Sequence, residues 1–220
     1  MANDSTGSAK DARAPVSSAA HESLLLDDLA IRRALMRIAH EIVEQAEDLS
    51  RIYLVGIPNG GVPLARRLAA NLHEIAGVDA VVGVLDTTLY RDDLASSGIR
   101  PRLRRTEMPS AVDERVVILV DDVASTGRTI RAAMDALMDF GRPRAVQVVA
   151  LVDRGHRELP IKIDYVGKNI PTHRSDRVKL RGEGDALEVV LLRGDESAGA
   201  AEPRAQRAAG ERRTTGEGAA

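Results

Sequence analysis

The segment Val116–Val120 limits most strongly how this chain can fold. It is a run of five apolar residues, four of them β-branched, as expected of a strand that is buried on both faces of a sheet. Short apolar runs also occur at Ile52–Val55, Val81–Leu85 and Val146–Val152. Segments of helical periodicity lie between these runs. The alternation predicts an α/β fold with a central, mainly parallel sheet flanked by helices.

The helices are predicted from the spacing of apolar residues and from the glycines that follow them. The first is an amphipathic helix over residues 25–48, with apolar residues three or four positions apart at Ile31, Leu35, Ile38 and Ile42. Two others are expected over residues 62–76 and 129–140, each ended by a glycine. Residues 87–113 predict a long loop or a flexible hairpin. Two or three short strands are expected within residues 161–192.

The two ends of the chain lack this patterning. Residues 1–20 and 194–220 have too few large apolar side chains to offset the cost of ordering them, so we expect disordered tails around one domain of residues 21–193. The 220 residues include no cysteine, which excludes disulfides, thiolate metal sites and cysteine nucleophiles. No run suits a membrane span or a secretory signal, so we expect a cytoplasmic protein without a membrane partner.

Two carboxylates directly follow the central strand. Asp121 and Asp122 come after Val120, within the sequence VILVDDVASTGRT of residues 117–129. Open α/β sheets bind ligands at the carboxyl ends of their strands, so these side chains lie where a site is expected. Ionised carboxylates only accept hydrogen bonds, so the pair suits two adjacent ribose hydroxyls or the water shell of a magnesium ion.

A short polar loop then opens the next helix. The N–H groups at the helix start, with the hydroxyls of Ser125, Thr126 and Thr129, suit a phosphate, and Gly127 allows close approach of the backbone. An Asp-capped turn or a Walker B-like strand end is the simpler alternative. The chain contains no GxxxxGK(S/T) sequence, however, so a P-loop nucleotidase would lack its main part.

Taken as a whole, residues 117–129 resemble the phosphoribosyl pyrophosphate (PRPP) signature of type I phosphoribosyltransferases. Three other segments, Ile31–Glu41, Asp86–Asp93 and Val152–Thr172, resemble the PyrR family of bifunctional pyrimidine operon attenuation regulators and uracil phosphoribosyltransferases. The resemblance covers about residues 25–192. It implies the type I phosphoribosyltransferase fold with a small hood.

The resemblance also implies a reaction, in which uracil and PRPP give UMP and pyrophosphate, with Mg²⁺ accompanying PRPP and no separate protein metal site. Asp121, Asp122 and Arg91 would be the catalytic residues, with the loop around Arg91 closing over the substrates. Arg154 and the backbone near Val178 would frame the base. The remaining implied substrate contacts are Asn59 and Gly60 at the pyrophosphate and the signature residues Val117, Ile118, Leu119, Val120, Val123, Ala124, Ser125, Thr126, Gly127, Arg128 and Thr129.

Two segments depart from the family pattern. Pro58-Asn59-Gly60-Gly61 stands where the family usually has a Lys/Thr-Arg-Gly turn, so one cation is missing from the expected pyrophosphate site. Ala124-Ser125 replaces the Leu-Tyr pair common in the family. Backbone N–H groups could compensate. The alternatives that stay open are an RNA-binding nucleotide sensor with weakened catalysis, and a salvage enzyme for another base that binds no RNA.

The first predicted helix has a basic face. Arg33, Arg37 and His40 lie opposite its apolar residues, and the resemblance implies that this face binds pyrimidine operon leader mRNA when UMP or UTP is bound. The other implied RNA contacts are Arg157, Lys162 and Lys168. A merely solvated face is the alternative, and His156 is interpreted as a hydrogen-bonded loop residue. The family implies a homodimer or a higher homo-oligomer, with the apolar residues of 24–31 as candidate contacts.

Overall fold

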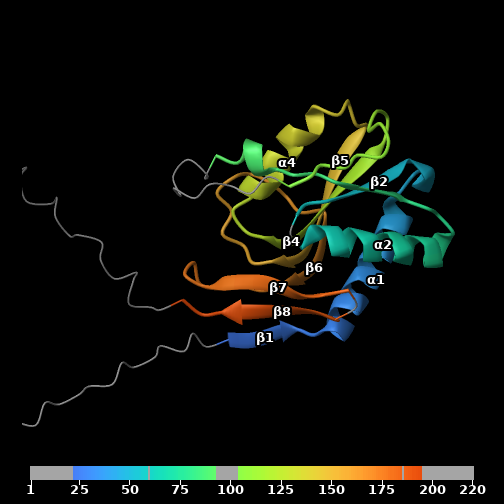
Figure 1. Cartoon of the computed structure of the whole chain (residues 1–220). Coiled ribbons are helices and arrows are strands. Elements are labelled where there is room, and N and C mark those ends of the chain that lie inside the picture. The colour runs from blue at the N-terminus through green and yellow to red at the C-terminus, as the bar shows by residue number, and fades with distance from the viewer. Residues whose placement is uncertain (1–21, 59, 93–103, 185, 195–220) are drawn as a thin grey trace, which may run out of the picture.

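The computed structural model describes residues 22–58, 60–92, 104–184 and 186–194. Its centre is a five-stranded sheet in the order β3-β2-β4-β5-β6, in which all four pairings are parallel. The α/β fold is therefore confirmed (Figure 1). The strands are β2 (Ile52–Gly56), β3 (Val81–Val84), β4 (Val116–Ala124), β5 (Ala145–Asp153) and β6 (Tyr165–Asn169).

Helices cover both faces of this sheet (Figure 1). The helices are α1 (Asp28–Gln45), α2 (Gly61–Ala76) and α4 (Arg128–Met138), with 3-10 turns η1 (Leu49–Arg51) and η2 (Thr88–Tyr90). Successive side chains of a strand point to opposite faces. Ile118 and Val120 of β4 accordingly pack in the cluster with α1 and α2, whereas Val117 and Leu119 pack in the cluster with α4. The apolar run of β4 is thus buried on both sides, as predicted.

A second, smaller sheet brings together residues from the two ends of the described chain. It is antiparallel, in the order β1-β8-β7, with β1 (Glu22–Leu26), β7 (Arg177–Glu183) and β8 (Ala186–Leu192). We call this sheet the hood. Asp28 at the start of α1 accepts hydrogen bonds from the backbone of Leu187 and from Arg67 of α2, which ties the hood to the main body.

The predicted start of the first helix at residue 25 is wrong. Leu24, Leu25 and Leu26 lie in β1, paired with β8, and the side chain of Asp27 caps the helix by accepting from the N–H of Ala30 at 2.7 Å. An apolar run that continues helical spacing concealed this boundary. The helix ends at Gln45, before residue 48, because Asp48 caps η1 instead.

The remaining differences concern loops and ends. Val84 and Glu107 exchange two backbone hydrogen bonds of 2.8 Å, so the described part of residues 87–113 returns antiparallel, as in the hairpin alternative. Residues 93–103 and the predicted tails lie outside the described residues, apart from Gly194. Among the helices described, none combines the length and the apolar character needed to cross a membrane.

Candidate functional site

The two aspartates of β4 define the centre of the site. Asp121 is only 5% exposed, while Asp122 is half-buried, and the two side chains are close enough to interact. Burial raises the pKa of Asp121 well above its ordinary value, and the neighbouring Asp122 raises it further, whereas the positive charge of Arg91 opposes the shift. A carboxyl group with a raised pKa at the carboxyl end of a central strand is typical of a functional site.

The turn before α2 lies directly against these aspartates. A Cβ atom added to Gly60 would come within 2.4 Å of a carboxylate oxygen of Asp122, and one added to Gly61 would come within 2.0 Å of the carbonyl oxygen of Val120. A side chain at Gly61 would clash with backbone, and one at Gly60 would displace the side chain of Asp122. The Gly60-Gly61 pair, which departs from the family pattern, is therefore shaped to bring backbone close to the end of β4. Asn59 lies outside the described residues.

The loop between β4 and α4 is short and ends in a left-handed residue. Gly127, at φ +92°, immediately precedes the first residue of α4, Arg128. This conformation favours glycine and points the first N–H groups of the helix out of its open end. The hydroxyls of Thr126 and Thr129 lie at the same end, so residues 124–129, which are predicted to hold a phosphate and which we call the phosphate loop, come together at the start of α4.

Arg91 reaches this loop from another part of the chain. One of its guanidinium nitrogens donates to the Thr129 hydroxyl at 3.2 Å, and its charge acts on Asp121. Next to it, Asp92 accepts from Arg128 at 2.6 Å, and the Tyr90 hydroxyl donates to Asp139. The segment predicted to close over the substrates therefore lies beside the phosphate loop.

Arg154 and the segment before Val178 also come together. The guanidinium group of Arg154 donates to the carbonyl oxygens of His173 and Asp176, at 2.8 and 2.7 Å. Its Nε atom is buried without a hydrogen-bond partner among the described residues, and burial lowers its pKa. The Val178 side chain is buried two residues further on. A small pocket of about 180 Å³ adjoins this group, lined by Ser125, Thr126, Arg154, His156, Glu158 and Arg174.

The residues predicted to bind RNA fall into two groups. His40, Lys162 and Lys168 are exposed and form no ion pair with another described residue. Arg37 instead pairs with Glu41 and donates to two carbonyl oxygens of β6, and all three guanidinium nitrogens of Arg157 donate within the chain. His156 is a hydrogen-bonded loop residue, as interpreted, 2.8 Å from the Thr172 carbonyl oxygen.

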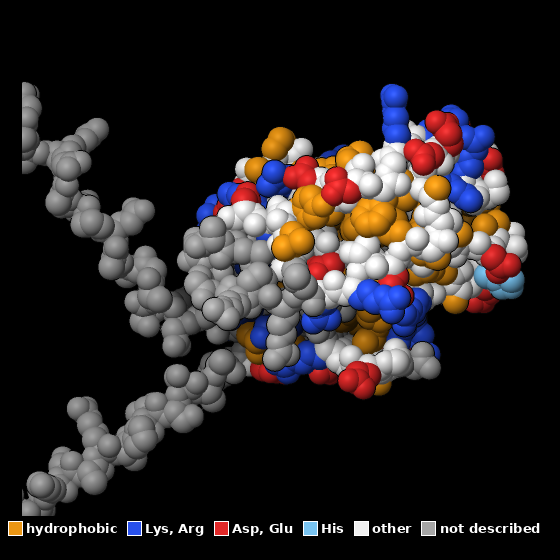
Figure 2. Space-filling view, turned by 45° about the horizontal axis from the view of Figure 1, so that its top comes forward, with side chains coloured by type: hydrophobic (Ala, Val, Ile, Leu, Met, Phe, Trp, Pro, Cys, Tyr) orange, Lys and Arg blue, Asp and Glu red, His pale blue; other side chains and the backbone are white. Residues whose placement is uncertain are grey.

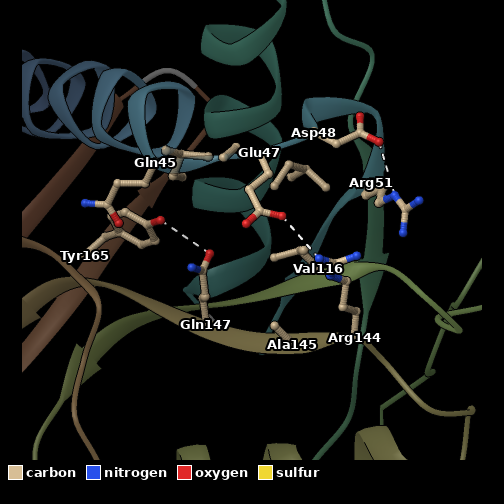
Figure 3. Close-up of a pocket in the computed structure, with 12 residues that line it drawn as sticks. Gln45, Glu47, Asp48, Arg51, Val116, Arg144, Ala145, Gln147 and Tyr165 are labelled. Carbon is tan, nitrogen blue, oxygen red and sulfur yellow. Dashed lines mark hydrogen bonds and ion pairs between the residues drawn. The ribbon is translucent and has the colours of Figure 1, made fainter.

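A larger pocket, of about 460 Å³, opens at the other end of the sheet (Figure 3). It lies where β4 and β5 begin, below the end of α1. Several of its polar side chains pair with one another: Arg144 pairs with Glu47 at 3.1 Å, and the Tyr165 hydroxyl donates to Gln147 at 3.3 Å. Ligands of open α/β sheets bind at the opposite edge, so the pocket is not the candidate site.

Two acidic residues next to the site were missed in the sequence. Asp153 ends β5 at the same edge as Asp121 and pairs with Arg157, and Asp176 is 7% exposed and accepts the N–H groups of His173 and Gly194. A signal existed for Asp153, because it directly follows a buried strand, as Asp121 does. Asp176 has no comparable signal, since its role depends on a turn between two distant segments.

Comparison with known proteins agrees with this geometry. Residues 22–182 match the phosphoribosyl transferase domain. "Bifunctional protein PyrR" of Pelotomaculum thermopropionicum is 53% identical over 175 residues, covering 79% of this chain and 97% of that protein, and its Deinococcus radiodurans counterpart is 51% identical over 79% and 95%. The crystal structure of hypoxanthine phosphoribosyltransferase from Trypanosoma cruzi has a TM-score of 0.58 at 19% identity, over 79% of this chain and 97% of that one.

Proposed function

Because this chain belongs to the PyrR family of phosphoribosyltransferases, we propose that it converts uracil and PRPP to UMP and pyrophosphate and also regulates a pyrimidine operon by binding its leader mRNA. The observation that carries the catalytic part is the convergence at one sheet edge of three features. These are the aspartate pair of β4, the Gly60-Gly61 turn and the loop that opens α4.

Each feature has a part in the transfer. Asp121 and Asp122 accept hydrogen bonds from the ribose hydroxyls, while the N–H groups before α4 hold the 5′-phosphate. Together they fix the sugar so that a bond forms from N1 of uracil to C1 as the bond from C1 to pyrophosphate breaks, and the departing pyrophosphate takes up the N1 proton. The transition state is oxocarbenium-like, so the negative charge of the aspartates beside the ribose also stabilises it. Arg91 and its neighbours exclude water when they cover the site.

The donor set fits Mg²⁺ that arrives with PRPP. The described residues contain no group of three or more His, Cys, Asp or Glu side chains that could cage a metal. Mg²⁺ commonly keeps several waters and is held by one or two carboxylates together with substrate phosphates. Asp121 and Asp122 are the carboxylates that would hold it, and the ion would neutralise the leaving pyrophosphate.

We propose that the leader mRNA binds the face of α1 beside β6. The exposed cations of this face are Arg33, His40 when protonated, and Lys168, with Lys162 nearby in sequence. Figure 2 shows acidic and basic side chains mixed over another face of the molecule. Recognition of a structured hairpin by a few matched phosphate contacts suits a face with few exposed cations.

A base panel tests the catalytic proposal. The protein is incubated with Mg²⁺, PRPP and each of uracil, cytosine, hypoxanthine and guanine, and nucleotide formation is followed. UMP from uracil alone supports the proposal. PRPP binding without turnover indicates a nucleotide sensor with weakened catalysis, and turnover of another base only indicates a salvage enzyme.

A hairpin assay tests the regulatory proposal. The affinity for a pyrimidine operon leader hairpin is measured with and without UMP, and a scrambled RNA of equal length is the control. We expect affinity that rises with UMP and falls with salt. His40→Ala with Lys168→Ala should weaken it, whereas affinity unaffected by UMP would contradict the regulatory part.

We also propose that the chain forms a homodimer or a higher homo-oligomer. Within residues 24–31, Leu26 and Ile31 are buried inside the chain, so they are not available as contacts. Leu24 and Leu29 are 59% and 52% exposed and remain candidates. Light scattering of the wild type and of Leu24→Ser with Leu29→Ser tests this contact, and an unchanged mass would contradict it.

A further inference from the structure

The segment that follows β5 donates hydrogen bonds to the carbonyl groups of the phosphate loop. The carbonyl oxygen of Ala124 accepts from the N–H of Arg154 at 3.0 Å, and that of Thr126 accepts from the N–H groups of Glu158 and Leu159 at 3.0 and 3.2 Å. Between these two, the carbonyl oxygen of Ser125 accepts from a guanidinium nitrogen of Arg157 at 2.6 Å. Three consecutive carbonyl groups are therefore turned toward residues 154–159.

This arrangement sets the direction of the loop's N–H groups. In a planar trans peptide unit the C=O and the next N–H point in opposite directions. Carbonyl groups turned toward residues 154–159 thus place the N–H groups of Ser125, Thr126 and Gly127 on the other side of the loop. Successive N–H groups on one side of a loop form an anion-binding concavity. Only the middle carbonyl, that of Ser125, relies on a side chain for its partner.

Arg157 is itself firmly placed. It forms a bidentate ion pair with Asp153, with distances of 3.0 and 2.6 Å, and its Nε donates to the Ile161 carbonyl oxygen at 3.0 Å. Its side chain is 25% exposed and that of Asp153 is 17% exposed. Asp153 also accepts from the N–H of Gly155 at 2.9 Å. A paired, largely buried guanidinium group is more specific in direction than an exposed one.

We propose that Arg157, oriented by Asp153, is a positioning residue that holds the phosphate loop in its binding conformation through the Ser125 carbonyl group. The resemblance to the family had placed Arg157 among the RNA contacts, whereas its hydrogen bonds lead to the nucleotide site. The proposal deepens the phosphoribosyl transfer proposed above, on which it rests. It predicts that Arg157 acts on the recognition of the 5′-phosphate.

The test compares ligands with and without the 5′-phosphate. Affinities for UMP, uridine and PRPP with Mg²⁺ are measured by calorimetry for the wild type, Arg157→Ala, Arg157→Lys and Asp153→Asn. In Arg157→Ala we expect UMP and PRPP to bind about 10- to 100-fold more weakly, as for loss of one charge-assisted hydrogen bond, with uridine binding nearly unchanged. Arg157→Lys, which keeps a donor, should recover part of the loss. The affinities of Asp153→Asn for UMP and PRPP should lie between those of Arg157→Ala and Arg157→Lys.

Controls separate this role from a general loss of structure and from an incorrect base assignment. Arg144→Ala removes an arginine and an ion pair at the opposite end of the sheet and should leave all three affinities unchanged. If the base is not uracil, the PRPP affinity still reports how well the phosphate loop binds the 5′-phosphate. Equal losses for UMP and uridine, or a ratio of UMP to uridine affinity within twofold of the wild type in folded Arg157→Ala, would overturn the proposal.

Discussion

The two ends of the central sheet differ in what their polar groups do. At the amino ends of the strands lies the larger pocket, where exposed side chains pair with one another, as Arg144 does with Glu47. At the carboxyl ends the cavity is smaller, but Asp121 is buried beside a second carboxylate and has a raised pKa. Gly60 and Gly61 bring backbone into contact with this pair.

The difference teaches that cavity volume alone does not locate the site. Ionising a carboxyl group that is buried next to a like charge costs free energy in the folded protein, because burial and the neighbouring charge both disfavour the ionised form. A ligand that donates hydrogen bonds, or a cation, relieves that cost. The paired side chains at the amino ends need no such partner, so the larger pocket there has no evident ligand chemistry.

The largest expected effect is on PRPP binding at the carboxyl edge. Asp121→Asn with Asp122→Asn should weaken PRPP binding by about 10²- to 10⁴-fold, since two charge-assisted hydrogen bonds are worth about 1.5–3 kcal/mol each. Calorimetry with Mg²⁺ present measures the loss. Glu47→Gln, the same type of change at the amino edge, is the control and should bind as the wild type does. Unaltered PRPP affinity in the double variant would refute the site.

A smaller effect is expected from filling the glycine contact. In Gly60→Ala the new Cβ would lie 2.4 Å from Asp122, so the carboxylate must move, and we expect the KM for PRPP to rise about 10- to 100-fold, as for loss of one charged hydrogen bond. Gly184→Ala is the control, because no atom lies within 4 Å of the added Cβ. Equal kinetics in the two variants would contradict a role for the contact between Gly60 and Asp122.

Much of this edge could be predicted from the sequence, because its residues are contiguous. The apolar run of β4, the two aspartates and the loop to Gly127 lie within one segment, and local rules place a strand, a turn and a helix there. Family resemblance implies that the loop around Arg91 closes over the substrates, and in the structure Arg91 donates a hydrogen bond to Thr129 at this edge. Contiguity also explains why the amphipathic face of α1 was identified correctly.

The rest depended on tertiary contacts that no local rule contains. Leu24–Leu26 continue helical spacing, yet they pair with β8 from the far end of the chain. Family resemblance implies an RNA contact for Arg157, but its partners Asp153 and Ser125 lie at the ends of two different strands. The contact between Gly60 and Asp122 likewise joins separate segments.

A third prediction uses the raised pKa of Asp121. A carboxyl group with a raised pKa in the folded state costs nothing below its unfolded value, and the cost grows as the pH rises through the folded value. Asp121→Asn should therefore match the wild type in thermal stability near pH 4 and exceed it at pH 8, by about 3–6 °C in Tm, which for a chain of this size is about 1–2 kcal/mol. Calorimetric melting without ligand at both pH values measures it. A difference independent of pH would contradict the assignment.

The smallest effect is expected at the amino edge. Arg144 is about half exposed and its partner Glu47 is more exposed still, so the ion pair should contribute about 0–1 kcal/mol to the free energy of unfolding. Arg144→Ala should therefore change Tm by no more than about 4 °C and should leave the KM for PRPP within about twofold of the wild type. Urea unfolding and initial rates measure both quantities. A large change in PRPP kinetics would contradict the contrast, because it would require coupling across the full length of β4 and β5. The unchanged PRPP kinetics expected for Arg144→Ala are thus the counterpart of the loss of PRPP affinity expected for the variant of Asp121 and Asp122. Both edges belong to the same strands, and they differ in whether their charges are already paired.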